Sequence, residues 1–150
     1  MKSAILKPIL LLFLLFMARP TSAMELELSG TLERALKGDR EAAYFLSTMY
    51  TTGNGAPRDC NEALKWGHTA AAQGHLFAQS QLGMLYLNGC GKTVPKNSVK
   101  AFIWLSLAAD QGLQFASVNL ADLRKTLHPY LLAEARRKAD RFKNARGDSD

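Results

Sequence analysis

The side chains with the most specific chemistry in this 150-residue sequence are two cysteines and three histidines. Thiols and imidazoles bind zinc, and two thiols also form a disulfide where the surroundings are oxidising. The spacing disfavours zinc, because Cys60 and His68 lie eight residues apart and neither Cys-x-x-Cys nor His-x-x-x-His occurs. We therefore expect His68 and His75 to be solvated or in loops, His128 to cap a helix, and no metal or other cofactor to be bound.

No group of residues has the pattern of a catalytic site. The acidic residues are scattered over positions that should be exposed on helices, and no nucleophile motif is present. Gly53-x-Gly55 and Gly89-x-Gly91 lack the preceding strand and the Lys-Ser/Thr pair of a phosphate-binding loop, so we expect turns between helices. The sequence therefore predicts a protein that is not an enzyme.

The elements that would position these residues follow an N-terminal segment with the pattern of a secretory signal peptide. Lysines precede an apolar run over 9–18, and a stretch of small residues ends at Ala23. The run has about half of the roughly 20 residues that a membrane-spanning helix needs. We expect cleavage after Ala23, with Ala18 as a second possible position, and an uncleaved amphipathic anchor or a buried helix as the alternatives.

The charge changes if this signal peptide, residues 1–23, is removed. The whole sequence has a net charge of +6, from 19 basic and 13 acidic residues. Cleavage deletes Lys2, Lys7 and Arg19 but no acidic residue, which leaves 16 basic and 13 acidic residues and a net charge of +3. This excess is too small to favour nucleic-acid binding. We expect a periplasmic or secreted domain over 24–150 without an integral membrane span.

The remaining sequence repeats itself with a period of 36 and then 38 residues. Gly38, Gly74 and Gly112 correspond to one another in this register. The same register aligns two further sets of residues, Ala42, Ala78 and Ala116, and Leu46, Leu82 and Leu120. A repeat of this length indicates a supersecondary unit that buries its apolar face by stacking on copies of itself.

Each unit is predicted to contain a first and a second helix. Apolar residues at helical spacing mark both helices, and a glycine such as Gly74 ends the second one. The second helix of the first unit starts at Asp59, and Glu62 follows at the spacing of a capping box. Asn97 takes the corresponding cap position in the next unit.

This pattern resembles the Sel1-like repeat family, a relative of the tetratricopeptide repeats. The second unit matches the family pattern at Ala78, Leu82, Gly83, Tyr86, Gly89, Gly91, Lys100, Ala101, Trp104, Ala108, Ala109 and Gly112. The first unit matches at Ala42, Leu46, Tyr50, Gly53, Gly55, Asp59, Ala63, Trp66, Ala70, Ala71 and Gly74, and it departs at Ser47, where the family has Gly. The resemblance implies an all-α fold, an α-α superhelix or solenoid of helix pairs. Its repeats would cover about 39–74 and 75–112, preceded by a closing helix over 31–37 and followed by capping helices over 113–146.

The stacking of helix pairs bears on the two cysteines. Cys60 lies at the start of one second helix, and Cys90 lies just past the first helix of the next unit. Both positions are at the same end of the stacked pairs, so the thiols can meet. A bridge would enclose about 30 residues and add a few kcal/mol to the stability. Two separate, partly buried thiols are the alternative.

The candidate binding surface is the side of the first helices that the core does not use. Solenoids usually hold partner segments on the concave side, which the first helices line. The residues expected there are Tyr44, Thr48, Phe77, Ser80, Met84, Leu87, Phe115 and Val118. An aromatic residue beside adaptable Met and Leu side chains suits an apolar peptide or helix, although some of these positions could belong to the core.

These features predict a scaffold for protein–protein interaction whose partner is another envelope or secreted protein. The resemblance to the family also implies the alternative of a periplasmic immunity protein that neutralises a toxic effector. A third hypothesis is an envelope enzyme or ligand binder acting on cell-wall fragments. That hypothesis predicts that His68, His75 and an acidic residue converge on one pocket.

Overall fold

The computed structural model describes residues 23–147, so the predicted signal peptide lies outside the described residues except for Ala23. Within 23–147 the chain forms helices and no strand, which confirms the all-α expectation. The helices are α2 (Ala23–Leu36), α3 (Arg40–Thr52), α4 (Cys60–Ala72), α5 (Leu76–Asn88), α6 (Ser98–Asp110), α7 (Gln114–Thr126) and α8 (Pro129–Gly147). None of them combines the length and the hydropathy that crossing a bilayer requires.

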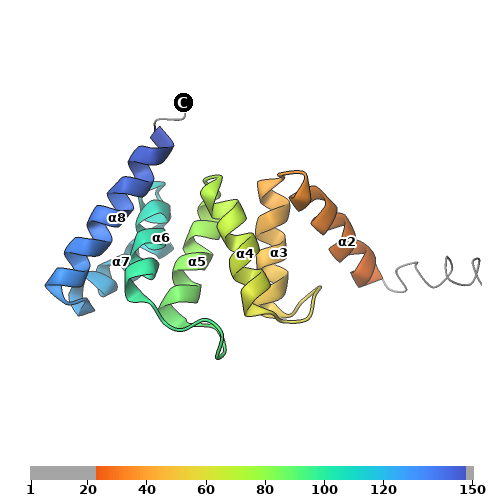
Figure 1. Ribbon diagram of the computed structural model, residues 1–150, viewed down its shortest axis with the longest axis horizontal. Helices are drawn as coiled ribbons and strands as arrows, with labels where there is room; N and C mark the ends of the chain where they lie inside the picture. Colours follow the sequence, from red (N-terminus) through yellow and green to blue (C-terminus); the bar gives the residue numbers. More distant parts are fainter. Residues whose placement is uncertain (1–22, 148–150) are drawn as a thin grey trace, which may run out of the picture.

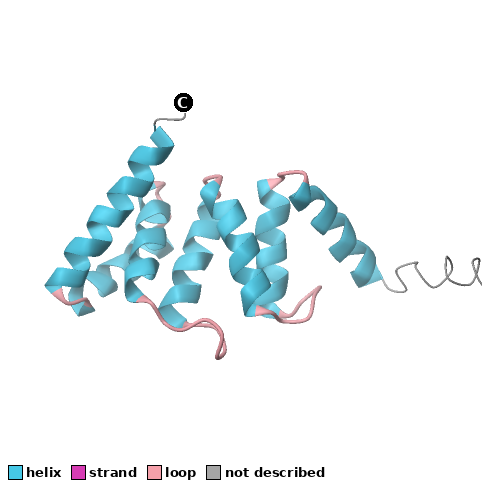
Figure 2. Cartoon of the chain, viewed as in Figure 1, coloured by secondary structure: helices cyan, strands magenta, loops and turns pink. Residues whose placement is uncertain are grey.

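The helices form a row in which each one runs opposite to the one before it (Figure 1). The first helices of the units are α3, α5 and α7, and the second helices are α4 and α6. From α2 to α7 each helix packs on its neighbours in the sequence, whereas α8 packs back on α6. Figure 2 shows the connections along both edges of the row, with the longer loops, α3–α4 and α5–α6, along the same edge. The structure is therefore a helical-repeat solenoid.

Three glycines end α2, α4 and α6 in the same way. Gly38, Gly74 and Gly112 all have positive φ angles, of 91°, 83° and 90°. After α4, the Gly74 amide donates to the Ala71 carbonyl and the next amide donates to the Ala70 carbonyl. This is the Schellman pattern, which satisfies free carbonyls at a helix end. The glycine period seen in the sequence is therefore a period of left-handed caps.

The second helices begin as predicted, but the predicted capping box is wrong. The Asp59 carboxylate accepts hydrogen bonds from the amides of Asn61 and Glu62, at 2.8 and 3.1 Å. The Glu62 carboxylate does not reach back to the Asp59 amide, which donates to the Tyr50 carbonyl instead. Glu62 accepts from the indole N–H of Trp66 at 3.0 Å. The indole of the buried Trp66 needs an acceptor, and it binds the Glu62 carboxylate that a capping box would use.

The helices of each unit approach closely because one of them carries a glycine at the contact. In the second unit, a Cβ on Gly83 would lie 2.6 Å from Cγ of Leu105. In the first unit the small residue is on the other helix, where a Cβ on Gly67 would lie 3.0 Å from Oγ of Ser47. Ser47 is fully buried and donates to the Ala63 carbonyl at 2.7 Å. The departure from the family pattern at this position is thus matched by a glycine opposite it.

Candidate functional site

Cys60 and Cys90 form a disulfide, with their Cα atoms 5.8 Å apart. Cys60 is the first residue of α4, and Cys90 follows α5 in a loop where it pairs with Val94 in an isolated bridge. The bond therefore joins the second helix of one unit to the end of the first helix of the next. The sequence left open whether the two cysteines form a bridge or remain separate thiols, and the structure shows the bridge.

An aromatic cluster lies where α3 meets the start of α5. The Tyr44 ring stacks on the His75 ring, with centroids 4.5 Å apart and planes 22° apart. Phe45 and Phe77 flank this pair, at 5.8 and 6.2 Å from the Tyr44 centroid. Phe45 is 50 % exposed and Phe77 is 53 % exposed. We call these four residues the aromatic cluster.

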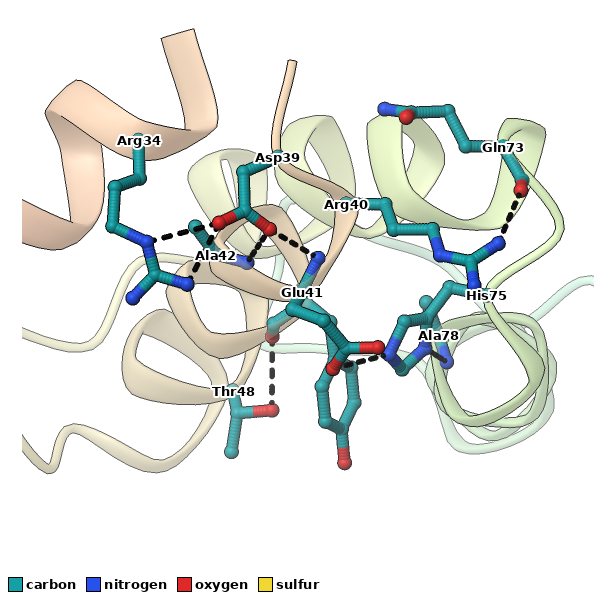
Figure 3. A network of polar contacts seen from close by, with 10 residues as sticks. Arg34, Asp39, Arg40, Glu41, Ala42, Thr48, Gln73, His75 and Ala78 are labelled. Carbon is teal, nitrogen blue, oxygen red and sulfur yellow. Dashed lines mark hydrogen bonds and ion pairs between the residues drawn. The ribbon is translucent and has the colours of Figure 1, made fainter. Parts of the chain in front are cut away.

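His75 fixes the geometry of this cluster. It is the N-cap of α5, and its Nδ1 accepts a hydrogen bond from the Ala78 amide at 3.1 Å. Its Nε2 lies 3.0 Å from Oε2 of Glu41 on α3 (Figure 3). Because Nδ1 accepts, Nε2 carries the proton and donates a hydrogen bond to the carboxylate. His75 lies in the turn between α4 and α5, as expected of a loop histidine, but its ring is buried rather than solvated and holds two helices together.

Asp39 has the equivalent position before α3. Its carboxylate accepts from the amides of Glu41 and Ala42 and pairs with Arg34 at 2.7 Å (Figure 3). The hydrogen bond from the Ala42 amide and the contact with Arg34 lower the pKa of Asp39 below its ordinary value. This carboxylate is therefore an ionised structural cap.

The predicted binding residues are distributed unevenly over the first helices. The structure brings Tyr44 and Phe77 together, and it leaves Phe115 and Val118 on α7 each 54 % exposed. Ser80 is buried at 6 % exposure, so it is not part of the exposed face.

The other three predicted residues, Thr48, Met84 and Leu87, are half-buried. Thr48 donates to the Tyr44 carbonyl and lines a shallow hollow with Phe45. Met84 lines another hollow beside the disulfide. Leu87 packs against the core. The sequence pattern missed Phe45, which is exposed on α3 next to Tyr44.

A larger cavity, of about 610 Å³, lies on the side of the second helices, and the sequence reasoning did not find it. Its wall includes His68 on α4, Tyr86 on α5, Trp104 on α6 and Phe142 on α8. Tyr86 and Trp104, which belong to the repeated pattern, are both largely buried. The residue that could have indicated a cavity is His68, a polar side chain of α4 that faces Tyr86 and Trp104.

His68 is also more enclosed than the sequence suggested. Its Nε2 hydrogen-bonds the Tyr86 hydroxyl at 2.9 Å, and its ring lies edge-on to Trp104 with centroids 5.3 Å apart. Burial lowers the pKa of His68 from its ordinary value, and the charge of Lys100 lowers it further. Burial also raises the pKa of Tyr86. Both groups are therefore uncharged at neutral pH.

The buried His75 and the half-buried His68 do not form one site. His75 faces Glu41 beside the first helices, whereas His68 faces Tyr86 on the side of the second helices. His128 has the predicted cap position, where its Nδ1 accepts from the Tyr130 amide at 3.3 Å. No cluster of three or more His, Cys, Asp and Glu side chains suited to a metal occurs among the described residues. The convergence that an enzyme acting on cell-wall fragments would require is absent from this part of the chain.

Comparison with protein families gives two matches, one for each unit. The family model for the Sel1 repeat matches residues 40–75 and 76–113. Among curated proteins, the chitin synthase regulator SKT5 of Malassezia restricta is 34 % identical over 77 residues. That stretch is 51 % of this chain but 5 % of the fungal protein, so the likeness concerns the repeats alone.

Two solved structures have the same arrangement of helices. One is c5321, a protective antigen present in uropathogenic Escherichia coli strains and displaying an SLR fold, with a TM-score of 0.74 and 28 % identity. It matches 81 % of this chain, which spans 26 % of that structure. The other is a Sel1 repeat protein from Oxalobacter formigenes, with a TM-score of 0.57 and 31 % identity over 62 % of this chain and 37 % of its own.

Proposed function

Since this chain belongs to the Sel1 repeat family, a group of protein-interaction scaffolds, we propose that it binds an apolar segment of another envelope or secreted protein on the exposed side of α3, α5 and α7. One observation carries the proposal, the set of large apolar side chains that the first helices leave in water. The enzyme and immunity-protein alternatives have no comparable support in the geometry.

The exposed residues follow the repeat. Phe77 and Phe115 each lie three residues after the glycine that ends a second helix, and they are 53 % and 54 % exposed. Half-exposed aromatic residues at equivalent positions are typical of a surface that meets a partner, because aromatic side chains dominate the energetics of interfaces. A partner that lies across successive first helices would bury both of them.

The aromatic cluster is held in place before a partner arrives. Tyr44 stacks on a His75 ring that is fixed at both nitrogens, by the Ala78 amide and by Glu41. A side chain that is already ordered loses less conformational entropy on binding. This rigidity supports Tyr44 and Phe77 as the centre of the surface.

Export is part of the proposal. The N-terminal sequence pattern supports it, and so does the Cys60–Cys90 disulfide, because such bonds persist mainly in oxidising compartments. A partner in the periplasm or outside the cell follows from that location.

The experiment uses a photoreactive amino acid placed at position 77 in the full chain, expressed in its host cells. The control carries the same group at position 130, since Tyr130 on α8 is 67 % exposed but lies outside the proposed surface. We expect position 77 to crosslink to a discrete envelope or secreted protein that position 130 does not capture.

Binding to that purified protein is then measured. Phe77→Ser should weaken it about tenfold or more, as expected for an aromatic residue in the centre of an interface, and Tyr130→Ser should change it less than about twofold. Equal effects of the two substitutions, or equal crosslinking from both positions, would overturn the proposal.

A further inference from the structure

The cavity on the side of the second helices is separate from the proposed protein-binding surface. It is lined by residues of α4, α5, α6 and α8 and is open to solvent on one side, and its volume of about 610 Å³ is within the usual range for small-molecule sites. Side chains from four helices converge on it, as in many sites that bind small molecules. We call it the second-helix pocket.

The inner wall of the second-helix pocket is apolar and aromatic. Ile103 and Trp104 come from α6 and Val99 from its first turn, and Phe142 comes from α8. The Trp104 and Phe142 rings lie 5.5 Å apart, and Phe142 remains 46 % exposed. An apolar or aromatic group placed against these two rings would remove exposed apolar surface from water.

The polar groups of the pocket have a net positive charge. Glu134 and Lys138 pair with each other at 2.6 Å, so their charges offset. His68 is neutral, since its pKa is lowered. The Lys100 ammonium lies 5.0 Å over the Tyr86 ring and forms no ion pair with any residue in the described part of the chain. A cation beside an apolar cavity, without a counter-ion, is complementary to an anion.

Asn97 adds a hydrogen-bond donor at the same end of α6. Its Oδ1 accepts from the Lys100 amide at 2.9 Å, which leaves the Nδ2 group as a donor. An ammonium and an amide donor near one another suit a carboxylate, which accepts several hydrogen bonds at once.

We propose that the second-helix pocket binds a small amphipathic carboxylate, with its anionic group beside Lys100 and its aromatic or aliphatic body against Trp104 and Phe142. The same chemistry is offered by a free organic acid and by a peptide that ends in a bulky apolar residue. This site is independent of the surface on the first helices.

The test uses 4-phenylbutyrate and its uncharged amide as probes of the full chain. Two-dimensional NMR of the tryptophan indole N–H groups follows the binding, because Trp104 lines the pocket and Trp66 lies in the other unit. We expect 4-phenylbutyrate to shift the Trp104 signal and leave that of Trp66 in place. The amide should bind about tenfold more weakly, since hydrogen bonds to charged groups are the stronger ones.

Two lysine variants provide a matched comparison. Lys100→Gln should weaken the binding of 4-phenylbutyrate about tenfold and leave that of the amide unchanged. Lys65→Gln is the control, because the Lys65 ammonium also lies 5.0 Å over an aromatic ring, that of Trp66, but outside the pocket. Both residues are exposed on helices, so neither variant should unfold the protein.

The peptide acetyl-Gly-Gly-Phe, with a free or an amidated C-terminus, distinguishes the two sources. Tighter binding of the free peptide than of 4-phenylbutyrate assigns the pocket to peptide C-termini, and the reverse order assigns it to free acids. If neither acid shifts Trp104, or if both lysine variants weaken binding equally, the proposal is wrong.

Discussion

His75 and Asp39 hold the same position in successive units, and each accepts a hydrogen bond from the first amides of the next helix. A carboxylate does this as an anion, whereas the imidazole accepts through Nδ1 and donates through Nε2 to Glu41. The third equivalent residue, Leu113, makes no side-chain cap. The three units therefore begin their first helices in three different ways, and both polar caps also hold the preceding unit, Asp39 through Arg34 of α2 and His75 through Glu41 of α3.

This arrangement predicts the effect of substitutions at position 75. His75→Ala removes the acceptor for the Ala78 amide and should lower the free energy of unfolding by about 1 kcal/mol or more. His75→Asn keeps a cap acceptor and should recover part of that loss, although neither variant can stack on Tyr44 as the imidazole does. Urea unfolding monitored by circular dichroism measures both. Equal stabilities of the two variants would show that the cap contributes nothing.

The lowered pKa of His68 predicts a pH dependence of stability. Burial and the charge of Lys100 hold this pKa below the ordinary value of 6.5, so below that pH the unfolded chain takes up a proton that the folded chain does not. Stability should therefore fall as the pH drops from about 6.5 towards the folded-state pKa. His68→Gln should reduce this dependence, and the urea midpoints at pH 7.5 and pH 5.5 give the comparison.

The lysine contribution to this pKa is tested by titration. NMR of the His68 ring should give a pKa below 6.5 in the wild type and a higher one in Lys100→Gln, because a like charge has been removed. A wild-type value at or above 6.5 would contradict the burial described above.

At the scale of the helices, the contact within each unit needs one small residue, but either helix can supply it. The second unit has Gly83 opposite Leu105, and the first has Ser47 opposite Gly67. Since the close-packed interior leaves no room for an added methyl group, each glycine sets the distance between its two helices.

Gly83→Ala tests this packing. Its new Cβ would lie 2.6 Å from Cγ of Leu105 and 3.2 Å from the Leu105 backbone nitrogen, so the helices would have to shift. We expect a loss of about 1–3 kcal/mol in the free energy of unfolding. Gly30→Ala in α2 is the control, because nothing lies within 4 Å of its added Cβ, and it should stabilise the protein by up to about 1 kcal/mol. Chemical denaturation of the two variants measures this difference in sign, and stabilisation by both would contradict the packing argument.

The helix positions could be predicted because their signals are local and repeated. The turn after α4 requires a left-handed conformation, which Gly74 adopts, and Asp59 accepts from the amides that follow it. Neither of these helix ends depends on distant parts of the chain. The role of Glu62 could not be predicted, since it depends on whether the Trp66 indole has another acceptor. The hydrogen-bond partner of Glu62 is decided by how the folded chain buries Trp66.

The candidate sites were less predictable for the same reason. Phe77 follows from the repeat register, but the burial of Ser80 depends on how neighbouring units pack. The second-helix pocket needs Phe142 of α8 to lie beside Trp104 of α6, and α8 is outside the repeat. A comparison of the units with one another carries no information about a contact between a unit and the terminal helix α8.

At the scale of the whole molecule, the helices of the row contact mainly their neighbours in the sequence, except that α8 packs on α6 (Figure 1). In such a solenoid the stability is close to a sum of terms for the units and for the interfaces between them. The Cys60–Cys90 disulfide spans one of these interfaces, from α4 to the loop after α5. Its contribution should therefore act on the coupling between the two units rather than on the helices within each.

Reduction of the disulfide tests this coupling. The bridge encloses a loop with a sequence separation of 30, for which the loss of chain entropy in the unfolded state corresponds to about 3–4 kcal/mol. We expect reduction to lower the urea midpoint by a corresponding amount and to broaden the transition, because the two units would unfold less cooperatively. The Cys60→Ala/Cys90→Ala variant should match the reduced wild type and should not respond to reductant. An unchanged midpoint after complete reduction would mean that packing between α4 and α5 alone holds the units together.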